Sequence, residues 1–230
     1  VAESIWKVAP EIVLEATTQS NQNGNASLFN AIKNINLTSY DSLVVGPGIG
    51  IDNDDWQKSE DYLIGFEGLL ILDADALNRI SKSKLGPKFF LERKFKTWIT
   101  PHNKEFFRLF PNIKCENNVG LALRAAKEFN ISVLLKGANS IVADNKGAWQ
   151  LYGTDSQTAR AGLGDLLSGF VAGSSAIDLT FCRDIKTEFF AKYVLLHSFA
   201  ASKCKTGSNA FAIGDELSKL IRKRKMRQIS

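Results

Sequence analysis

The sequence predicts an α/β fold in which helices cover both faces of a largely parallel sheet, and three observations lead to this prediction. Short apolar runs rich in β-branched residues recur along the chain, as is typical of strands buried on both faces. Longer segments with helical spacing of apolar residues lie between these runs. After Gly164 the pattern is helical almost to the end. Alternating strands and helices indicate parallel strands joined by helices that pack on the sheet.

The elements follow one another in a regular order. The helical segments that separate the strands include 54–66 and 118–129. Residues 139–153 differ, because two strand-like runs flank an Asp-Asn-Lys-Gly turn and predict a hairpin. The polar segment SNQNGNASLFN (20–30) predicts a surface loop. The predicted strands are EIVLEAT (11–17), SLVVG (42–46), LLILDAD (69–75), KTWIT (96–100), SVLLKG (132–137) and SIVAD (140–144).

Length and composition favour one domain over residues 1–230. Apolar residues make up 44% of the chain, enough for a sizeable core, and no run approaches the ~20 apolar residues of a membrane helix. Cys115, Cys182 and Cys204 are odd in number and lack CxxC spacing. This usage indicates a reducing, cytoplasmic setting and argues against a disulfide framework or a zinc site.

The net charge of +5 comes from the C-terminal segment IRKRKMR, which holds five basic residues. Without them, 24 basic residues face 24 acidic ones, so the body of the chain is neutral. We therefore expect no nucleic-acid partner, and no membrane partner either. The only methionine is Met226, so we expect the chain to belong to a longer or processed polypeptide.

The candidate site lies where the strands end, because ligands of open α/β sheets bind beyond the carboxyl ends of the strands. Four turns there carry Gly, Asp, His or Lys, and each also has a plainer interpretation as a tight turn, a helix cap or an exposed lysine. They are GPGIG (46–50), DADALN (73–78), TPHNKEF (100–106) and KGANS (136–140).

A fifth turn, AGLGD (161–165), is the strongest single feature. Gly162 and Gly164 precede an apolar helix, and a glycine-flanked helix start offers free N–H groups to an anion. Asp165 on the first turn can take a proton from a hydroxyl while these groups stabilise a phosphoryl group. A helix cap is the plainer alternative for this carboxylate. No GxxxxGK[ST] motif occurs in the chain.

The ordered set GPGIG, LDADALN, TPHNKEF, LLKGANSIVAD and AGLGDLLSG resembles the ADP/ATP-dependent NAD(P)H-hydrate dehydratases of the ribokinase-like superfamily. The resemblance runs from about Asp41 to Gly214. It implies a three-layer ribokinase-like fold and repair of hydrated NADH or NADPH. In this reaction the ring hydroxyl is phosphorylated by ADP or ATP with Mg²⁺, and phosphate is then lost.

The resemblance also implies roles for individual residues. Asp165 would be the catalytic base and would contact the substrate. The hydrated dinucleotide would also contact Gly48, Gly50 and His102, and Glu105 would help to hold magnesium through water. Asp73 and Asp75 receive only a loose role near the substrate. The nucleotide would lie along Lys136, Gly137, Ala138, Asn139 and Ser140, with Gly162 and Gly164 at its phosphates.

The chain departs from the family pattern in three places. Asn103-Lys104 stands where the family has Pro-Gly, and Ala161-Gly162-Leu163 stands where it has two glycines and Ser or Thr. The Gly-rich strand and helix that normally open the domain are absent, so the chain is either a fragment or a decayed member of the family. In bacteria the dehydratase is often fused behind an epimerase domain, and a fused N-terminal epimerase domain would agree with the missing start methionine.

Two other functions stay open at this stage: a small-alcohol kinase of the same superfamily, and a nucleotide-binding module without turnover. A homo-oligomer is also open, as are the preferences for ADP or ATP and for NADH or NADPH hydrate. His197, inside an amphipathic helix, is predicted to be a core residue.

Overall fold

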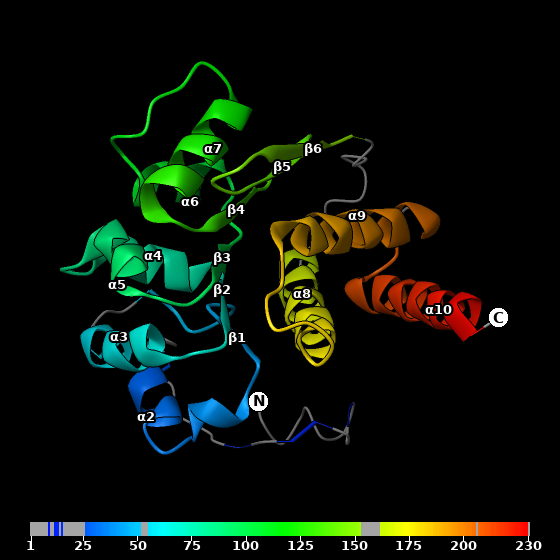
Figure 1. The fold of residues 1–230 in the computed structure, drawn as a ribbon, viewed down its shortest axis with the longest axis horizontal. Coiled ribbons are helices and arrows are strands. Elements are labelled where there is room, and N and C mark those ends of the chain that lie inside the picture. The colour runs from blue at the N-terminus through cyan, green and yellow to red at the C-terminus, as the bar shows by residue number, and fades with distance from the viewer. Residues whose placement is uncertain are drawn as a thin grey trace.

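The architecture is a twisted sheet between two layers of helices (Figure 1). The computed structural model describes residues 9, 12–13, 15, 26–51, 55–152, 162–205 and 207–229, with the backbone alone from 223 onward. Six strands of this described part pair in sequence order, the first four parallel and the last two antiparallel. They are β1 (Ser42–Val45), β2 (Leu69–Leu72), β3 (Thr97–Ile99), β4 (Ser132–Leu135), β5 (Ser140–Ala143) and β6 (Ala148–Leu151).

The helices divide between the two faces of the sheet. In Figure 1, α3 to α7 lie on one side of the strands, α8 and α9 lie on the other, and α10 packs beyond α8 and α9. The helices are α2 (Leu28–Ile32), α3 (Trp56–Gly65), α4 (Asp75–Lys82), α5 (Phe89–Glu92), α6 (Asn103–Leu109), α7 (Asn118–Phe129), α8 (Leu163–Leu179), α9 (Thr187–Lys203) and α10 (Ala210–Ile229), with short 3₁₀ turns at Leu37–Ser39 and Gly86–Lys88.

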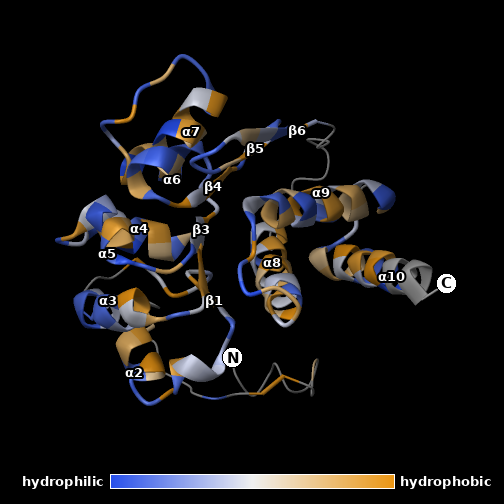
Figure 2. Ribbon diagram, viewed as in Figure 1, coloured by the Kyte–Doolittle hydropathy of each residue, from blue (hydrophilic) through white to orange (hydrophobic). Residues whose placement is uncertain are grey.

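A separate hydrophobic core lies on each face of the sheet. Under α3 to α7, aromatic rings pack edge to face and offset, including Phe106, Phe110 and Phe129. Under α8 and α9, the Trp98 ring stacks on Phe190 with centroids 4.6 Å apart. Every residue of β2 is buried, because both faces of the strand are covered. Figure 2 shows the hydrophobic residues along the central strands and the polar ones on the outer side of α3.

Most predicted elements are confirmed. The predicted three-layer, largely parallel α/β fold is present, the two helical segments appear as α3 and α7, and β5 and β6 form the predicted hairpin. The prediction for 20–30 was wrong in its last residues, because Leu28 is buried and begins α2; residues 20–25 lie outside the described part.

The predicted strand 11–17 was wrong where the structure describes it. Ile12, Val13 and Glu15 are in no strand, and the side chains of Ile12 and Val13 are 44% and 77% exposed. A short apolar run forms a strand only if a neighbour is there to pair with it, and these residues pair with none of the strands described. The rest of this segment lies outside the described residues.

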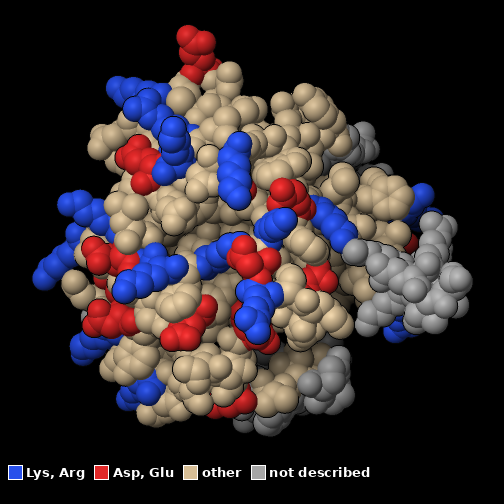
Figure 3. All heavy atoms as spheres, in the orientation of Figure 1, with Lys and Arg blue, Asp and Glu red and all other residues tan. Residues whose placement is uncertain are grey.

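The surface and the thiols agree with the composition. On the face in Figure 3, lysines and arginines alternate with acidic residues. Cys115, Cys182 and Cys204 are free thiols. Within the described ranges, no helix is long and apolar enough to cross a membrane. His197 is 5% exposed within α9, which confirms the predicted core position.

The end of β1 lies directly against the end of β2, and Gly46 permits this contact. Its φ is +136°, and a Cβ built there would lie 1.7 Å from the Asp73 carbonyl oxygen. We predict that Gly46→Ala lowers the free energy of unfolding by at least about 4 kcal/mol, measured by urea denaturation. Gly48→Ala is the control, because its φ is +70° and a Cβ there meets nothing within 4 Å. It should cost only about 1–2 kcal/mol, and equal losses for both variants would contradict the contact.

His197 makes stability depend on pH. Burial lowers its pKa from 6.5 to about 4, although a hydrogen bond to the Leu163 backbone opposes the shift. The unfolded chain therefore binds more protons between pH 6.5 and 4, so the contribution is present above pH 6.5 and is lost as pH falls toward 4. We predict that His197→Phe removes up to about 3 kcal/mol of this pH dependence. Thermal melting between pH 7 and 5 tests it, and an unchanged slope would contradict it.

Candidate active site

The predicted turns meet at the carboxyl ends of the parallel strands. The Asp73 N–H donates to the Val45 carbonyl (3.1 Å), which joins the end of β2 to that of β1. The Lys136 N–H donates to the Pro101 carbonyl (2.8 Å), and Lys136 pairs with His102 in a short parallel bridge beyond β3 and β4. Four turns that lie far apart in the sequence therefore form one edge of the sheet.

Asp73 is the buried centre of this edge, with 1% of its surface exposed. Its Oδ1 accepts hydrogen bonds from Lys136 Nζ (2.8 Å) and from the Ala74 N–H (2.8 Å). Its Oδ2 accepts one from Ser168 Oγ (2.6 Å). A buried carboxylate needs such donors to offset the loss of its hydration. This carboxylate thus joins β2, β4 and α8.

Helix α8 begins at this carboxylate and is open to solvent there. Gly162 is its N-cap, with φ +78°, and makes no side-chain cap. A Cβ built on Gly164 would lie 3.8 Å from both Lys136 Nζ and Asp73 Oδ2, so the first turn of α8 lies beside the ammonium group. Asp165 is on that turn and its side chain is exposed. The positive helix end therefore lies beside an ammonium group, and an exposed carboxylate is on the same turn, a suitable arrangement for an anion and a hydroxyl.

Asp75 points the other way, toward the Gly46–Gly50 loop. Its Oδ2 accepts a hydrogen bond from the Gly50 N–H at 2.9 Å. Asp75 does not cap α4, whose N-cap is Ala74 without any side-chain bond. Ala74 has φ +48°, a conformation that costs a residue with a Cβ about 1–3 kcal/mol. Asp73 and Asp75 flank this strained residue, and its conformation lets their carboxylates point to different parts of the site.

His102 and Glu105 form a capping box at the start of α6. His102 Nδ1 accepts from the Glu105 N–H (3.2 Å), and Glu105 Oε2 accepts from the His102 N–H (2.9 Å). The Glu105 side chain is buried, whereas half of the His102 side chain is exposed. The histidine therefore has an edge available to a ligand, and the glutamate is occupied by the helix start.

A hollow of about 800 Å³ lies beside the KGANS turn. Val119 and Ile141 give it apolar walls, and amide side chains and backbone surround them. This mixture suits a flat heteroaromatic base, which needs apolar faces and a few hydrogen-bonding groups. The lining residues are Asn103, Asn117, Asn118, Val119, Gly137, Ala138, Asn139, Ile141 and Gln150.

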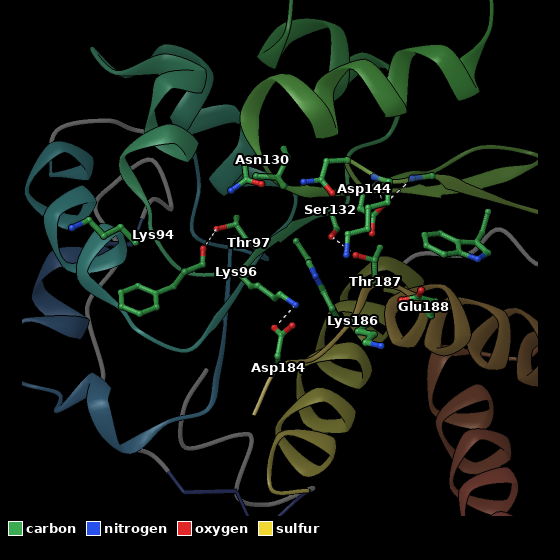
Figure 4. A pocket seen from close by; sticks show the side chains of 17 residues that line it. Lys94, Lys96, Thr97, Asn130, Ser132, Asp144, Asp184, Lys186, Thr187 and Glu188 are labelled. Carbon is green, nitrogen blue, oxygen red and sulfur yellow. Dashed lines mark hydrogen bonds and ion pairs between the residues drawn. The ribbon is translucent and has the colours of Figure 1, made fainter. Parts of the chain in front are cut away.

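A second hollow, of about 540 Å³, lies at the opposite end of the strands (Figure 4). Its lining includes the residues that precede β3 and β4 and the start of α9. In Figure 4, Lys96 and Asp184 point toward one another and form an ion pair, and Ser132 lies against Thr187. None of the predicted site residues lines it, and we assign the site to the carboxyl ends of the strands.

The structure thus brings together Lys136, Gly164, His102 and the turn that carries Asp165, with the Gly46–Gly50 loop attached through α4. The segment 153–161 that leads to α8, including Ala161, lies outside the described residues. Sequence reasoning missed the contact of Ser168 with Asp73, although its place one turn after Gly164 was visible. It also missed Arg79, which looks like an ordinary helix-surface residue in the sequence.

Known proteins are similar to this chain in sequence. A family model described as NAD(P)H-hydrate dehydratase matches residues 3–223. The bifunctional NAD(P)H-hydrate repair enzyme Nnr of Synechocystis sp. is 32% identical over 165 residues, which are 71% of this chain and 30% of that protein. The Thermofilum pendens enzyme of the same name is 28% identical over 220 residues, 93% of this chain and 41% of that protein. The chain therefore spans about a third of the length of these relatives.

Solved structures resemble the fold. The ADP/ATP-dependent NAD(P)H-hydrate dehydratase of Bacillus subtilis, co-crystallised with ATP and Mg²⁺ and soaked with CoA, matches with a TM-score of 0.68. It is 19% identical, and the match covers 96% of this chain and 77% of that one. A ribokinase-like superfamily protein of Enterococcus faecalis matches with the same score, 21% identity and coverages of 81% and 64%. These structures show the fold, and the family model that matches residues 3–223 shows that the chain belongs to the NAD(P)H-hydrate dehydratase family.

Proposed function

We propose that the chain catalyses the ADP- or ATP-dependent dehydration of hydrated NADH or NADPH, which restores the reduced dinucleotide. The observation that carries the proposal is the position of the Lys136 ammonium group beside the open first turn of α8, which also holds Asp165. Membership of the family supplies the reaction, and this arrangement supplies groups suited to it.

The transferring phosphoryl group would lie against Gly162 and Gly164. Backbone N–H groups at the start of a 17-residue helix stabilise the charge of such a group. Lys136 donates one hydrogen bond to Asp73, and an ammonium group has three donors in all, so it retains donors for phosphate oxygens. Phosphoryl transfer depends mainly on positioning and charge stabilisation, which these groups provide.

Asp165 would act as the general base. Its carboxylate takes the proton of the ring hydroxyl while the hydroxyl oxygen bonds to the terminal phosphorus of the nucleotide. The bond from that phosphorus to the bridging oxygen breaks, and AMP leaves from ADP, or ADP from ATP. The bond between the ring carbon and the ester oxygen then breaks, inorganic phosphate leaves with the former hydroxyl oxygen, and loss of a proton from the adjacent ring carbon restores the double bond.

The remaining predicted contacts would position the two substrates. The adenine nucleotide would extend along Lys136, Gly137, Ala138, Asn139 and Ser140, with its base in the hollow of about 800 Å³ beside them. The hydrated dinucleotide would contact Gly48, Gly50 and the exposed edge of His102. The bridge between His102 and Lys136 places these two groups of contacts next to each other.

Magnesium would be held mainly by the nucleotide. The described residues contain no group of three His, Cys, Asp or Glu side chains suited to a metal, and both Glu105 oxygens lie near His102 atoms. Mg²⁺ keeps several waters and commonly binds through substrate phosphates with one or two carboxylates, so contact through water fits Glu105. When bound, the ion neutralises phosphate charge.

The setting of the enzyme also forms part of the proposal. We place it in the cytoplasm, in agreement with its three free thiols. A fused N-terminal epimerase domain agrees with the greater length of the bifunctional relatives. The expected partners are small molecules, namely hydrated NAD(P)H and ADP or ATP. Assembly into a homo-oligomer is compatible with the proposed function.

The assay follows absorbance at 340 nm with hydrated NADH or NADPH, Mg²⁺, and either ADP or ATP. We expect recovery of absorbance with one nucleotide, together with stoichiometric AMP or ADP and inorganic phosphate. Nucleotide binding without recovery would overturn dehydration and favour a binding module. Phosphorylation of a small alcohol without action on the hydrate would favour the kinase.

Asp165→Asn tests the base directly. We predict a loss of turnover of at least about 10³-fold with nucleotide Kd within about threefold, because the amide cannot accept the proton. Gly169→Ala on the same helix is the control, since a Cβ there meets nothing within 4 Å and it should retain activity. Near-normal turnover of Asp165→Asn would contradict the assignment.

A further inference from the structure

Helix α4 holds both backbone groups of Gly50. Asp75 Oδ2 accepts from the Gly50 N–H (2.9 Å), and Arg79 Nε donates to the Gly50 carbonyl (2.8 Å). Arg79 Nη2 also donates to the Ile49 carbonyl (2.5 Å). Asp75 and Arg79 are four residues apart and so share a face of the helix. The loop Gly46–Gly50 is therefore fixed from one side by one helix.

Arg79 is a buried cation that contacts mostly backbone. Only 1% of its surface is exposed, and beyond the loop it donates to the Ala26 carbonyl (3.0 Å) and pairs with Asp55 (3.5 Å). The face of Trp56 lies 5.9 Å from the guanidinium. Burying a guanidinium is costly, and a well-packed apolar residue often serves stability as well or better. The planar group is suited to hold several carbonyls in one geometry.

The loop needs such support because of its own conformation. Gly46, Gly48 and Gly50 all have positive φ, at +136°, +70° and +75°. Glycine adopts these conformations without strain, but it also loses more conformational entropy than any other residue when it becomes ordered. Gly48 is exposed on the loop, so the face opposite α4 is available to a ligand.

We propose that Arg79, together with Asp75, is a positioning residue that holds the Gly46–Gly50 loop in the shape that binds the hydrated dinucleotide. This inference rests on the proposed function. Arg79 is too buried to touch the substrate and acts through the loop. Arg79 thereby sets the affinity for the dinucleotide. None of its hydrogen bonds to described residues reaches the nucleotide turn 136–140.

Arg93 offers a matched control at the opposite end of the strands. It is also buried, at 5% exposure, and burial lowers its pKa to about 10. Its guanidinium likewise donates to backbone carbonyls, and it also bonds to Thr97 Oγ1 (2.9 Å). The carbonyl partners are those of Leu63, Ile64, Gly68 and Lys96. Replacing it removes the same kind of contact without disturbing the Gly46–Gly50 loop.

The test compares Arg79→Lys with Arg93→Lys. We expect both to lower Tm, but only Arg79→Lys to raise KM for hydrated NADH, by about tenfold or more, with kcat and nucleotide KM within about threefold. Asp75→Ala removes the acceptor of the Gly50 N–H and should raise the same KM, and Asp75→Asn, which keeps an oxygen acceptor there, should raise it less. Equal changes in both KM values, or no change for Arg79→Lys, would overturn the inference.

A second readout separates this inference from the proposed function. Amide hydrogen exchange at residues 49–50 should become faster in Arg79→Lys and Asp75→Ala, and it should be unchanged in Arg93→Lys. Wild-type protein that leaves both hydrated NADH and hydrated NADPH unconverted, with either ADP or ATP, would overturn the proposed function. The exchange rates would then test the positioning role independently. Faster exchange in Arg79→Lys and Asp75→Ala supports that role, and unchanged exchange overturns it.

Discussion

The candidate site depends on one buried carboxylate. Asp73 accepts hydrogen bonds from the Lys136 ammonium, the Ser168 hydroxyl and the Ala74 N–H, and almost none of it reaches solvent. These bonds join β4 and α8 to the end of β2 across gaps of 63 and 95 residues in sequence. Without the carboxylate, the ammonium and the first turn of α8 would both carry positive charge at close range with nothing between them. The carboxylate therefore stabilises the ammonium group and the helix start in the arrangement that we propose for binding a phosphoryl group.

The same short segment also orients the opposite side of the site. Asp73 turns toward α8 and Asp75 toward the glycine loop, and the positive φ of Ala74 between them makes this divergence possible. Backbone strain of this kind persists only where surrounding contacts over-determine it. Here the contacts are those of Asp73 on one side and of α4 with the loop on the other. The half of the site proposed to bind the phosphoryl group and the half proposed to bind the dinucleotide are thus connected through three consecutive residues.

Much of this arrangement could be predicted from the sequence, for physical reasons. Strands buried on both faces leave continuous apolar runs, so β1 to β5 were visible, and parallel order places their carboxyl ends together. Glycines before Asp165 predicted an open helix start because that feature depends on local chain chemistry. The predicted strand at 11–17, which is absent at residues 12, 13 and 15, shows the limit, because strand pairing depends on a distant neighbour that a short apolar run does not reveal.

The sequence could not predict which distant groups each side chain contacts. Asp75 had two local readings, a helix cap or a ligand contact, and the structure shows a third, a hydrogen bond to the Gly50 N–H. Arg79 received no role from the sequence, because nothing local marks its position as 1% exposed. Both contacts join residues at least 25 positions apart, and only the packed sheet fixes such distances.

The most direct measurement of the central claim is Asp73→Asn, assayed for nucleotide Kd and for kcat/KM with hydrated NADH. Ser168→Ala, which removes one neutral hydrogen bond from the same carboxylate, is assayed beside it. If Asp73 holds Lys136 against the start of α8, Asp73→Asn should raise the nucleotide Kd about tenfold and lower kcat/KM about 10²-fold or more, and Ser168→Ala should lower it less than about tenfold. Nucleotide affinity and turnover of Asp73→Asn close to those of the wild-type protein would contradict the claim.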